Sequence, residues 1–267
     1  MNKTQIISVI NQKGGVGKTT TVINLAAGLV QENKKILVID LDPQGNATTG
    51  LGLSNLDNSS ETIYGVLNGT KNITQVIKKT QFENLELISS NVDLSGLEVE
   101  TAGDSKRAFI LKDQLMAYLK DSGAKYDYIF IDCPPSLSLL TVMALVSSHS
   151  LVVPLQTEFF ALEGLTQLMK TIDRVKVNLN PSLKIRGILL TMYDKRNKLS
   201  SQVEKEARDY FTNQVYTSVI PRNVRLSEAP SHGVPVIIYD KSCSGSRSYI
   251  SFTDEFLKQE NIMESAA

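Results

Sequence analysis

QKGGVGKTTT, residues 12–21, stands between two apolar segments of different kinds. It follows the short apolar run Ile6–Ile10 and opens the segment Thr19–Val30, where apolar residues recur at helical spacing. A strand, a glycine-rich turn and a helix in this order form a cradle for phosphate groups, because backbone N–H groups and the positive end of the helix dipole converge there. An ordinary glycine turn before a helix is the alternative. The Gly-Lys-Thr run at 17–19 favours the phosphate site, so the stretch predicts binding of a nucleoside triphosphate.

The residues of this loop have separate uses in such a site. Its three glycines permit turn conformations in which the backbone comes close to phosphate oxygens. Lys18 can reach the β- and γ-phosphates, and the Thr19 hydroxyl can ligate a magnesium ion. We therefore expect nucleotide contacts along the whole loop, from Lys13, Gly14, Gly15, Val16, Gly17, Lys18, Thr19 and Thr20.

The composition is that of a soluble globular protein and sets broad limits. The 267 residues are 42% hydrophobic and 21% charged, enough for one large α/β domain or two small ones. Cys133 and Cys243 provide neither a disulfide framework nor a paired metal motif, which suits a reducing cytosol. The N-terminus does not read as a signal peptide, and we find no apolar run long enough to span a membrane. We expect a cytoplasmic protein that does not enter membranes.

Charge is unevenly distributed along a chain whose formal net charge is zero. Residues 164–250 contain 14 Lys and Arg against 7 Asp and Glu, which leaves a net charge of −7 on the remainder. This asymmetry points to an anionic partner, although a solvated surface is the commoner explanation of excess lysine.

The order of apolar segments predicts the fold. Eight have the composition of buried strands: Ile6–Ile10, Ile36–Ile39, Leu85–Ile88, Tyr126–Ile131, Leu151–Leu155, Ile185–Met192, Val215–Ile220 and Val236–Tyr239. Six have helical periodicity: Thr19–Val30, Lys106–Leu119, Leu137–Val146, Glu163–Val177, Ser201–Phe211 and Ser248–Glu260. We expect short helices and loops at 53–82 and assign no structure to Asn91–Glu100. Strands that alternate with helices predict an α/β fold, a single domain over residues 1–267 with a doubly wound, mostly parallel sheet of about eight strands and helices on both faces.

Three aspartates follow predicted strands, at the edge where open α/β sheets bind ligands. Asp132 fits a Walker B role, a carboxylate close to magnesium, although a strand-end aspartate often caps the next helix. Asp40 and Asp42 flank Leu41, so on a strand their side chains share one face. One can help fix the water shell of the metal while the other orients or deprotonates the attacking water. A turn-forming aspartate before Pro43 is the alternative.

At Lys13 the chain resembles a particular family of ATPases. The general phosphate loop has glycine five residues before Gly17, whereas this chain has Gln12, followed by Lys13. This pattern is similar to the deviant Walker A family, which includes ParA, Soj, MinD and the nitrogenase iron protein. The resemblance implies that Lys13 takes part in catalysis with Lys18, by reaching across a dimer interface to the phosphates of the partner's ATP.

Further motifs resemble the Soj branch of this family. The run Asp40–Asn46 matches the family's switch I residue for residue, which implies that Asp42 activates water and that Asp40 lies nearer the metal, with Thr19 and Asp132. Ile220–Gly233 matches a Soj signature, which implies that Pro221 and Asn223 contact adenine. Two arginines at matching positions are implied to grip DNA phosphates, with solvated loop charges as the alternative: Arg196 and Arg225.

The resemblance implies a function as well as a fold. It predicts a Mg²⁺-dependent ATPase of DNA partitioning, cytoplasmic and nucleoid-associated, whose ATP-dependent homodimer binds double-stranded DNA without sequence preference. A ParB-type centromere-binding partner would stimulate hydrolysis and release the dimer. The phosphate loop begins at residue 12, which leads us to expect no N-terminal DNA-reading extension. The alternative is a MinD-like, membrane-cycling division regulator, which the acidic tail Asp254–Ala267 disfavours.

Other conspicuous residues receive structural interpretations. His149 and His232 lack the spacing of metal ligands, so we expect structural roles for them. Cys133 has no base or second cysteine nearby in the sequence that would make it a nucleophile, and two cysteines at these positions do not suit an iron–sulfur cluster. We expect Phe159 and Phe160 to pack in the core or at a dimer interface.

Overall fold

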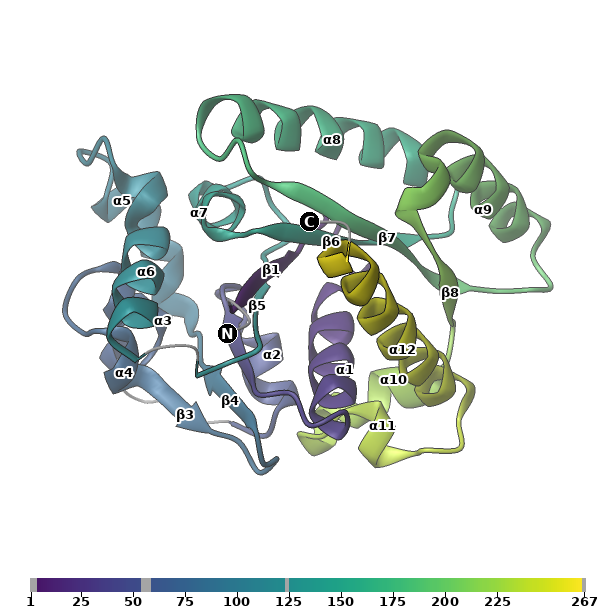
Figure 1. Ribbon diagram of the computed structural model, residues 1–267, viewed down its shortest axis with the longest axis horizontal. Helices are drawn as coiled ribbons and strands as arrows, with labels where there is room; N and C mark the ends of the chain where they lie inside the picture. Colours follow the sequence, from purple (N-terminus) through teal and green to yellow (C-terminus); the bar gives the residue numbers. More distant parts are fainter. Residues whose placement is uncertain (1–3, 54–58, 123–124, 266–267) are drawn as a thin grey trace.

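An eight-stranded sheet runs through the computed structural model, which describes residues 4–53, 59–122 and 125–265 (Figure 1). Its order is β3-β4-β2-β5-β1-β6-β7-β8. The strands are β1 (Gln5–Val9), β2 (Ile36–Asp40), β3 (Ile77–Lys79), β4 (Leu85–Ile88), β5 (Tyr128–Asp132), β6 (Ser150–Gln156), β7 (Lys184–Tyr193) and β8 (Val215–Pro221). All neighbours in the sheet pair in parallel except β3 and β4.

Strand order places the ends of three strands side by side. The first strand, β1, lies between β5 and β6, and the chain winds outward from it in both directions. In the register of the sheet, Asp132 is opposite Val9 on one side and opposite Asp40 on the other. The phosphate loop after β1 and two of the three predicted acidic residues therefore meet at the carboxyl edge, at the switch point where open α/β sheets bind ligands.

Helices cover both faces of the sheet. On one face lie α1 (Lys18–Gln31), α2 (Asn46–Gly50), α10 (Val224–Glu228), α11 (Val236–Tyr239) and α12 (Ser244–Ser265). On the other lie α3 (Ile63–Leu67), α4 (Ile73–Val76), α5 (Leu97–Glu100), α6 (Ile110–Ser122), α7 (Leu139–Ser147), α8 (Ala161–Asn178) and α9 (Lys198–Phe211). Short 3₁₀ helices occupy Ser59–Glu61, Val92–Gly96, Arg107–Phe109, Thr212–Gln214 and Ala229–His232.

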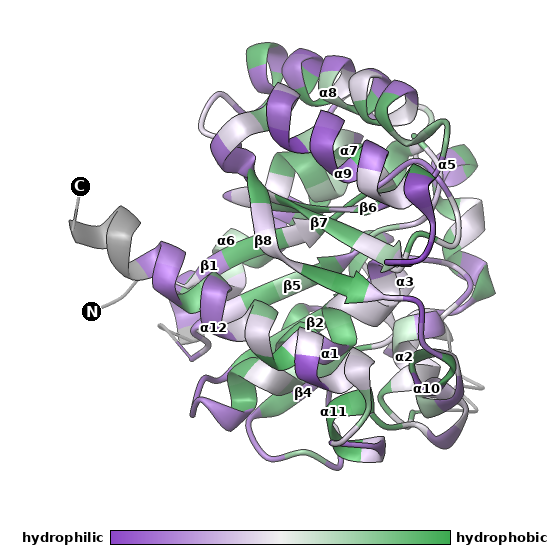
Figure 2. Ribbon diagram, turned by 90° about the vertical axis from the view of Figure 1, so that its right-hand side faces the viewer, coloured by the Kyte–Doolittle hydropathy of each residue, from purple (hydrophilic) through white to green (hydrophobic). Residues whose placement is uncertain are grey.

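Burial on both faces explains the apolar strands. All five residues of β2 and of β5 are buried, as expected for central strands of a covered parallel sheet. The outer helices are amphipathic instead, and Figure 2 shows hydrophilic and hydrophobic stretches alternating along α8. The buried side chains of α8 recur at helical spacing: Ala161, Leu165, Leu168, Ile172 and Val175. The predicted α/β class, doubly wound parallel sheet and helices on both faces are confirmed.

Two predicted assignments were wrong, and both concern short segments. Val236–Tyr239, predicted as a strand, is a helix that follows Pro235 and buries Val236 and Ile237. Four apolar residues do not distinguish a strand from a buried helical turn. The eighth strand is β3, inside the stretch 53–82 where we expected helices and loops, and residues 54–58 of that stretch lie outside the described residues. Its two lysines suit an edge strand, which needs no apolar run.

Helix α12 closes the last edge of the sheet. The Glu255 carboxylate accepts hydrogen bonds from the backbone N–H groups of Thr217 and Ser218, at 2.6 and 2.8 Å. These contacts satisfy part of the open edge of β8. They also fix α12 beside β8, the strand that ends at Pro221. In the described part of the chain, none of the helices has the length and apolar content needed to cross a lipid bilayer.

Candidate functional site

The phosphate loop has the backbone of an anion cradle. Gly15 and Gly17 have φ angles of 74° and 89°, in the left-handed region where a side chain would cause strain. Gly17 is the N-cap of α1, so the loop leads directly into the first turn of a 14-residue helix. Gly14 does not have a positive φ, and a β-carbon there would make an ordinary contact with Pro135. Two of the three glycines therefore shape the loop by their backbone conformation.

Two residues that the sequence analysis did not assign hold the loop in place. The Asn11 side chain accepts a hydrogen bond from the Lys13 N–H at 3.0 Å and donates one to the Pro154 carbonyl at 2.7 Å. The Thr191 hydroxyl donates to the Val16 carbonyl at 2.8 Å. The sequence did contain a signal for Asn11, because this polar residue directly follows the predicted apolar strand Ile6–Ile10. No sequence signal marked Thr191, because it lies within an apolar strand segment.

The two lysines of the loop point to different places. Lys18 is 6% exposed, and its ammonium group donates to the Lys13 carbonyl at 3.0 Å. Burial lowers the pKa of Lys18, although nearby carboxylates, including those of Asp132 and Asp42, act in the opposite direction. The Lys13 side chain is about half exposed and forms an ion pair with Glu158, in the loop before α8. Lys18 thus points into the cradle formed by its own loop, whereas Lys13 pairs on the surface outside it.

Asp132 is a buried carboxylate without a suitable partner. It is 0% exposed, and neither of its oxygens has a hydrogen bond of good geometry. Burial raises its pKa well above the ordinary value, and the charge of neighbouring Asp40 raises it further, while the Thr19 hydroxyl and Lys18 work against the rise. An orphaned carboxylate in the interior is costly unless a cation neutralises it. Together with the Thr19 hydroxyl, Asp132 fits a magnesium ion that takes its other ligands from water and phosphate.

Asp40 is equally buried but is fully engaged by the chain. One oxygen accepts from the Thr48 N–H at 2.8 Å and from the Thr48 hydroxyl at 2.7 Å, and the other accepts from the Asp42 N–H at 3.2 Å. Burial raises the pKa of Asp40 to about 6, against the effect of these bonds. Of the two carboxylates at this point in the sheet, Asp132 is therefore the one whose oxygens remain available.

Asp42 lies at the wall of a cavity of about 470 Å³. Its side chain is 6% exposed, and one oxygen accepts from the Gln44 N–H at 3.0 Å. The cavity is bordered by Gly14, Gly15, Gly17, Lys18, Thr19, Thr20, Ile23, Asp42, Gln44, Asn46, Thr49, Pro135, Met192, Pro230 and Ser231. The phosphate loop, the switch I segment and the loop after β5 thus surround one space.

A second hollow of about 280 Å³ continues this cavity. Pro221 and Asn223, predicted to contact adenine, both line it. The Asn223 side chain also caps α10 by accepting from the Arg225 N–H at 2.8 Å, and it donates to the Ser244 hydroxyl at 2.9 Å. The two hollows share Gly17, Thr20, Met192 and Pro230. The resulting trough has a polar end and a less polar end, which suits a nucleotide.

Met192 is a functional candidate that the sequence analysis missed. It lies at the end of β7 with a φ of 51°, a left-handed conformation that is uncommon for a non-glycine residue. Because it borders both hollows, it stands where the hollow along the glycine-rich loop meets the hollow beside Pro221. Such strain tends to occur at binding sites, but composition gives no signal for it.

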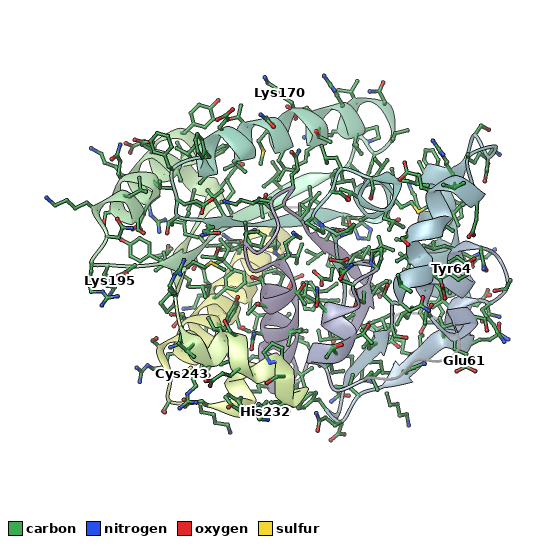
Figure 3. The ribbon with its side chains drawn as sticks, turned by 180° about the vertical axis from the view of Figure 1, so that it is seen from behind. Glu61, Tyr64, Lys170, Lys195, His232 and Cys243 are labelled. Atoms are coloured by element: carbon green, nitrogen blue, oxygen red, sulfur yellow. The ribbon has the colours of Figure 1, made fainter. Side chains whose placement is uncertain are left out.

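The two predicted DNA-contact arginines lie beyond the trough. Arg196 follows β7, and its guanidinium group contacts Asp194 through two hydrogen bonds of 3.1 and 3.0 Å while remaining 90% exposed. Arg225, on α10, pairs with Glu228 at 2.7 Å and with Asp240 at 3.6 Å. A hollow of about 520 Å³ beside Arg196 is lined by Tyr193, Asp194, Lys195, Arg196, Val219, Pro221, Arg222, Ser244 and Ser248. Figure 3 shows Lys195 at the rim of the molecule, in the loop after β7.

The remaining predictions can be compared with the structure directly. Phe159 and Phe160 are 74% and 67% exposed, so packing in the core is wrong and packing at an interface remains a prediction. His149 accepts a hydrogen bond from the Ile6 N–H at 2.9 Å, and His232 stacks on Tyr239, so both take part in packing and bonding within the chain. Cys133 is buried, and burial raises the pKa of its thiol, which keeps it in the less reactive protonated form.

Replacement of Asp132 tests whether this buried carboxylate lacks a compensating partner, and the test uses protein without bound nucleotide. Because burial raises the pKa of Asp132 well above its ordinary value, protonation of this carboxyl stabilises the folded state, and that contribution is lost as the pH rises from the ordinary range of an aspartate toward neutral. We expect Asp132→Asn to raise the free energy of unfolding at neutral pH by about 1–2 kcal/mol and to flatten its decline between mildly acidic and neutral pH. Urea denaturation in the presence of EDTA measures both effects.

The matched control is Asp93→Asn, the same change at an exposed residue. A lower stability of Asp132→Asn than of this control at neutral pH would contradict the interpretation of Asp132 as an uncompensated carboxylate.

Comparison with known proteins places the site in context. A family model described as an AAA domain matches residues 4–185. The chromosome partitioning protein ParA of Caulobacter vibrioides is 48% identical over 266 residues, which cover 100% of this chain and 98% of the relative. The sporulation initiation inhibitor protein Soj of Bacillus subtilis is 48% identical over 251 residues, covering 94% of this chain and 97% of the relative.

Solved structures of similar fold contain nucleotides. A crystal structure described as cobyrinic acid a,c-diamide synthase from Mycobacterium smegmatis, with bound ATP analog and magnesium, has a TM-score of 0.82 and 33% identity and covers 97% of this chain and 96% of its own. MinD of Pyrococcus horikoshii, complexed with Mg-ADP, has a TM-score of 0.78 and 27% identity, with 97% and 98% covered. The similarity extends over nearly the whole length in each case.

Proposed function

Since this chain belongs to the ParA/Soj family of chromosome-partitioning ATPases, we propose that ATP drives it through a cycle of dimerisation, DNA binding and release. A single ATPase domain carries the cycle. ATP lies in the trough, with its phosphates toward the loop after β1 and its adenine toward Pro221 and Asn223. The two adjoining hollows support this orientation, because the polar groups of the loop border the first and Pro221 borders the second.

At the phosphate end, Thr19, Asp132 and Asp40 would hold a magnesium ion. Bound there, the ion neutralises phosphate charge and the orphaned carboxylate together. Lys18 contacts the phosphates from within the loop, exchanging its bond to the Lys13 carbonyl for phosphate oxygens. Asp42 borders the same cavity and takes the proton of the attacking water or orients that water.

The position of Lys13 carries the proposal of a dimer. Its ammonium group pairs with Glu158 outside the cradle, and the residue does not border the cavity that its own loop forms. An exposed ion pair contributes only about 0–1 kcal/mol, so a triphosphate presented by a second subunit would readily displace Glu158. In the dimer each Lys13 contacts the nucleotide of the partner subunit, where its charge stabilises phosphoryl transfer. Phe159 and Phe160, exposed beside Glu158, provide apolar surface for the same interface.

The closed dimer then binds double-stranded DNA without sequence preference. Support comes from the basic groups around the hollow after β7, where Arg196, Arg222 and Lys195 gather, with Arg225 nearby on α10. Such groups recognise the phosphate backbone and need no base contacts. A ParB-type partner stimulates hydrolysis, and the dimer leaves the DNA. The protein acts on the nucleoid in this cycle.

Light scattering after gel filtration tests the dimer. We expect wild-type protein with ATP and Mg²⁺ to elute as a dimer, and Lys13→Gln to remain monomeric while binding ATP with an affinity within about threefold of wild type. The reason is that Lys13 serves the partner's nucleotide, so that its loss leaves the cradle of its own subunit intact.

The matched control is Lys170→Gln, the same change on the outer side of α8, where Figure 3 labels Lys170. A Lys13→Gln dimer as stable as that of the control would refute the role of Lys13 across the interface.

A further inference from the structure

Thr48 is a buried residue at the site for which neither the motif nor the cavity provides a role. It lies in α2, is 4% exposed and does not border either hollow of the trough. Nevertheless its backbone N–H and its hydroxyl both donate to one oxygen of Asp40, at 2.8 and 2.7 Å. The same hydroxyl accepts a hydrogen bond from the Ser90 N–H at 3.0 Å. Thr48 therefore links the end of β4 to the carboxylate at the end of β2.

The carboxylate in turn fixes the segment that contains Asp42. The second oxygen of Asp40 accepts from the Asp42 N–H at 3.2 Å, so Asp40 contacts both sides of the loop between β2 and α2. Gly45, within this loop, has a φ of 63°, and a β-carbon there would lie 3.3 Å from the Ser90 carbonyl. The loop is thus closed tightly against Ser90 at one end and against Asp40 at the other.

We propose that Thr48 is a positioning residue for ATP hydrolysis, which acts through Asp40 to hold Asp42 at the cavity. This inference rests on the proposed role of Asp42. The Thr48 hydroxyl is suited to the task because it bonds as donor to Asp40 and as acceptor to Ser90 at once. If the hydroxyl is lost, a buried N–H group loses its partner and Asp40 loses one of three bonds. Asp42 then lies less accurately relative to the attacking water.

The test compares the isosteric variant Thr48→Val with the conservative variant Thr48→Ser. We expect Thr48→Val to lower kcat by about ten- to a hundredfold with KM for ATP within about threefold, because a misplacement of about 1 Å suffices for such a loss. Thr48→Ser retains the hydroxyl and should stay within about threefold of wild-type kcat. Should Thr48→Val be recovered unfolded, Thr48→Ala, which keeps the backbone bond to Asp40, takes its place with the same expected loss.

A second measurement reports on the loop itself. In hydrogen–deuterium exchange without nucleotide, we expect residues 42–50 to exchange faster in Thr48→Val than in wild type, and at the wild-type rate in Thr48→Ser. The matched control is Thr253→Val, because Thr253 is 2% exposed and its hydroxyl donates to the Tyr249 carbonyl at 2.9 Å, away from the phosphate end. This control should lose stability without a loss of kcat.

The outcomes separate this inference from the proposed function. Wild-type kcat and unchanged exchange in Thr48→Val would overturn the positioning role and leave the proposed function intact. A loss of kcat in Thr48→Ser as large as that in Thr48→Val would also overturn it, because the hydroxyl would then not be the cause. If wild-type protein bound ATP without hydrolysing it, the proposed function would fail, and faster exchange in Thr48→Val would still support the contact between Thr48 and the loop.

Discussion

Asp42→Ala is expected to bind ATP and to form the dimer but to hydrolyse ATP about 10²–10⁴ times more slowly than wild type, the range typical of a lost general base. Asp42 borders the phosphate cavity and is 6% exposed, so its carboxylate is held by the surrounding chain at the place where the attacking water is expected. The phosphate loop does not depend on this side chain, and so the affinity for ATP should be retained. Single-turnover hydrolysis, followed on protein saturated with ATP and Mg²⁺, separates the chemical step from binding.

Two further variants sharpen this prediction. Asp42→Asn keeps the shape of the side chain and its hydrogen-bond acceptor for Gln44 but removes the base, so it should be as slow as Asp42→Ala. Asp93→Ala, the same change at an exposed residue, should hydrolyse ATP at the wild-type rate. Undiminished turnover in Asp42→Ala would remove Asp42 from the mechanism and direct attention to the neighbouring Asp132.

The second large effect is expected for charge reversal on the basic surface. Arg196→Glu and Arg225→Glu should each weaken binding to random duplex DNA by at least about tenfold, and should reduce the dependence of binding on salt, because fewer counterions are released. Each change occurs twice in a dimer, which enlarges the effect. Both side chains are exposed and their present partners are carboxylates, so DNA phosphates can replace those partners.

Fluorescence anisotropy over a series of salt concentrations measures these effects. The affinity for ATP is measured in parallel, because Arg225 lies close to Asn223 and the trough. Arg174→Glu, a reversal at an exposed position of α8, is the matched control and should bind DNA as wild type does. Equal affinities of Arg174→Glu, Arg196→Glu and Arg225→Glu would place the DNA-binding surface elsewhere.

The sequence predicted the motifs of the site better than the hydrogen bonds that join them. The phosphate loop follows from glycines, a lysine and a helix start, which are local features, and the parallel sheet follows from apolar strands that alternate with helices. Asp40 and Asp132 are 92 residues apart in the chain, and the aspartates could be expected to meet because each ends a strand. Neither oxygen of Asp132 has a hydrogen bond of good geometry, whereas Thr48 donates two hydrogen bonds to Asp40. No local sequence pattern distinguishes Thr48, so this difference between the two aspartates could not be predicted.

The errors have the same origin. Val236–Tyr239 forms a helix because Pro235 and the contact with α1, where the Asn24 side chain accepts from the Val236 N–H at 2.8 Å, outweigh an apolar pattern of four residues. Phe159 and Phe160 are apolar in sequence and exposed in the fold, since the turn that carries them faces outward. The strain at Met192 arises only where β7 meets the trough. Each depends on tertiary contacts between distant segments.

The measurement that tests the central claim most directly is binding of wild-type protein to random duplex DNA with ATP, with ADP and without nucleotide. The account predicts binding with ATP alone, at an affinity that falls steeply as salt is raised. Equal binding in all three states, or none in any of them, would contradict the proposal that ATP switches this protein onto DNA.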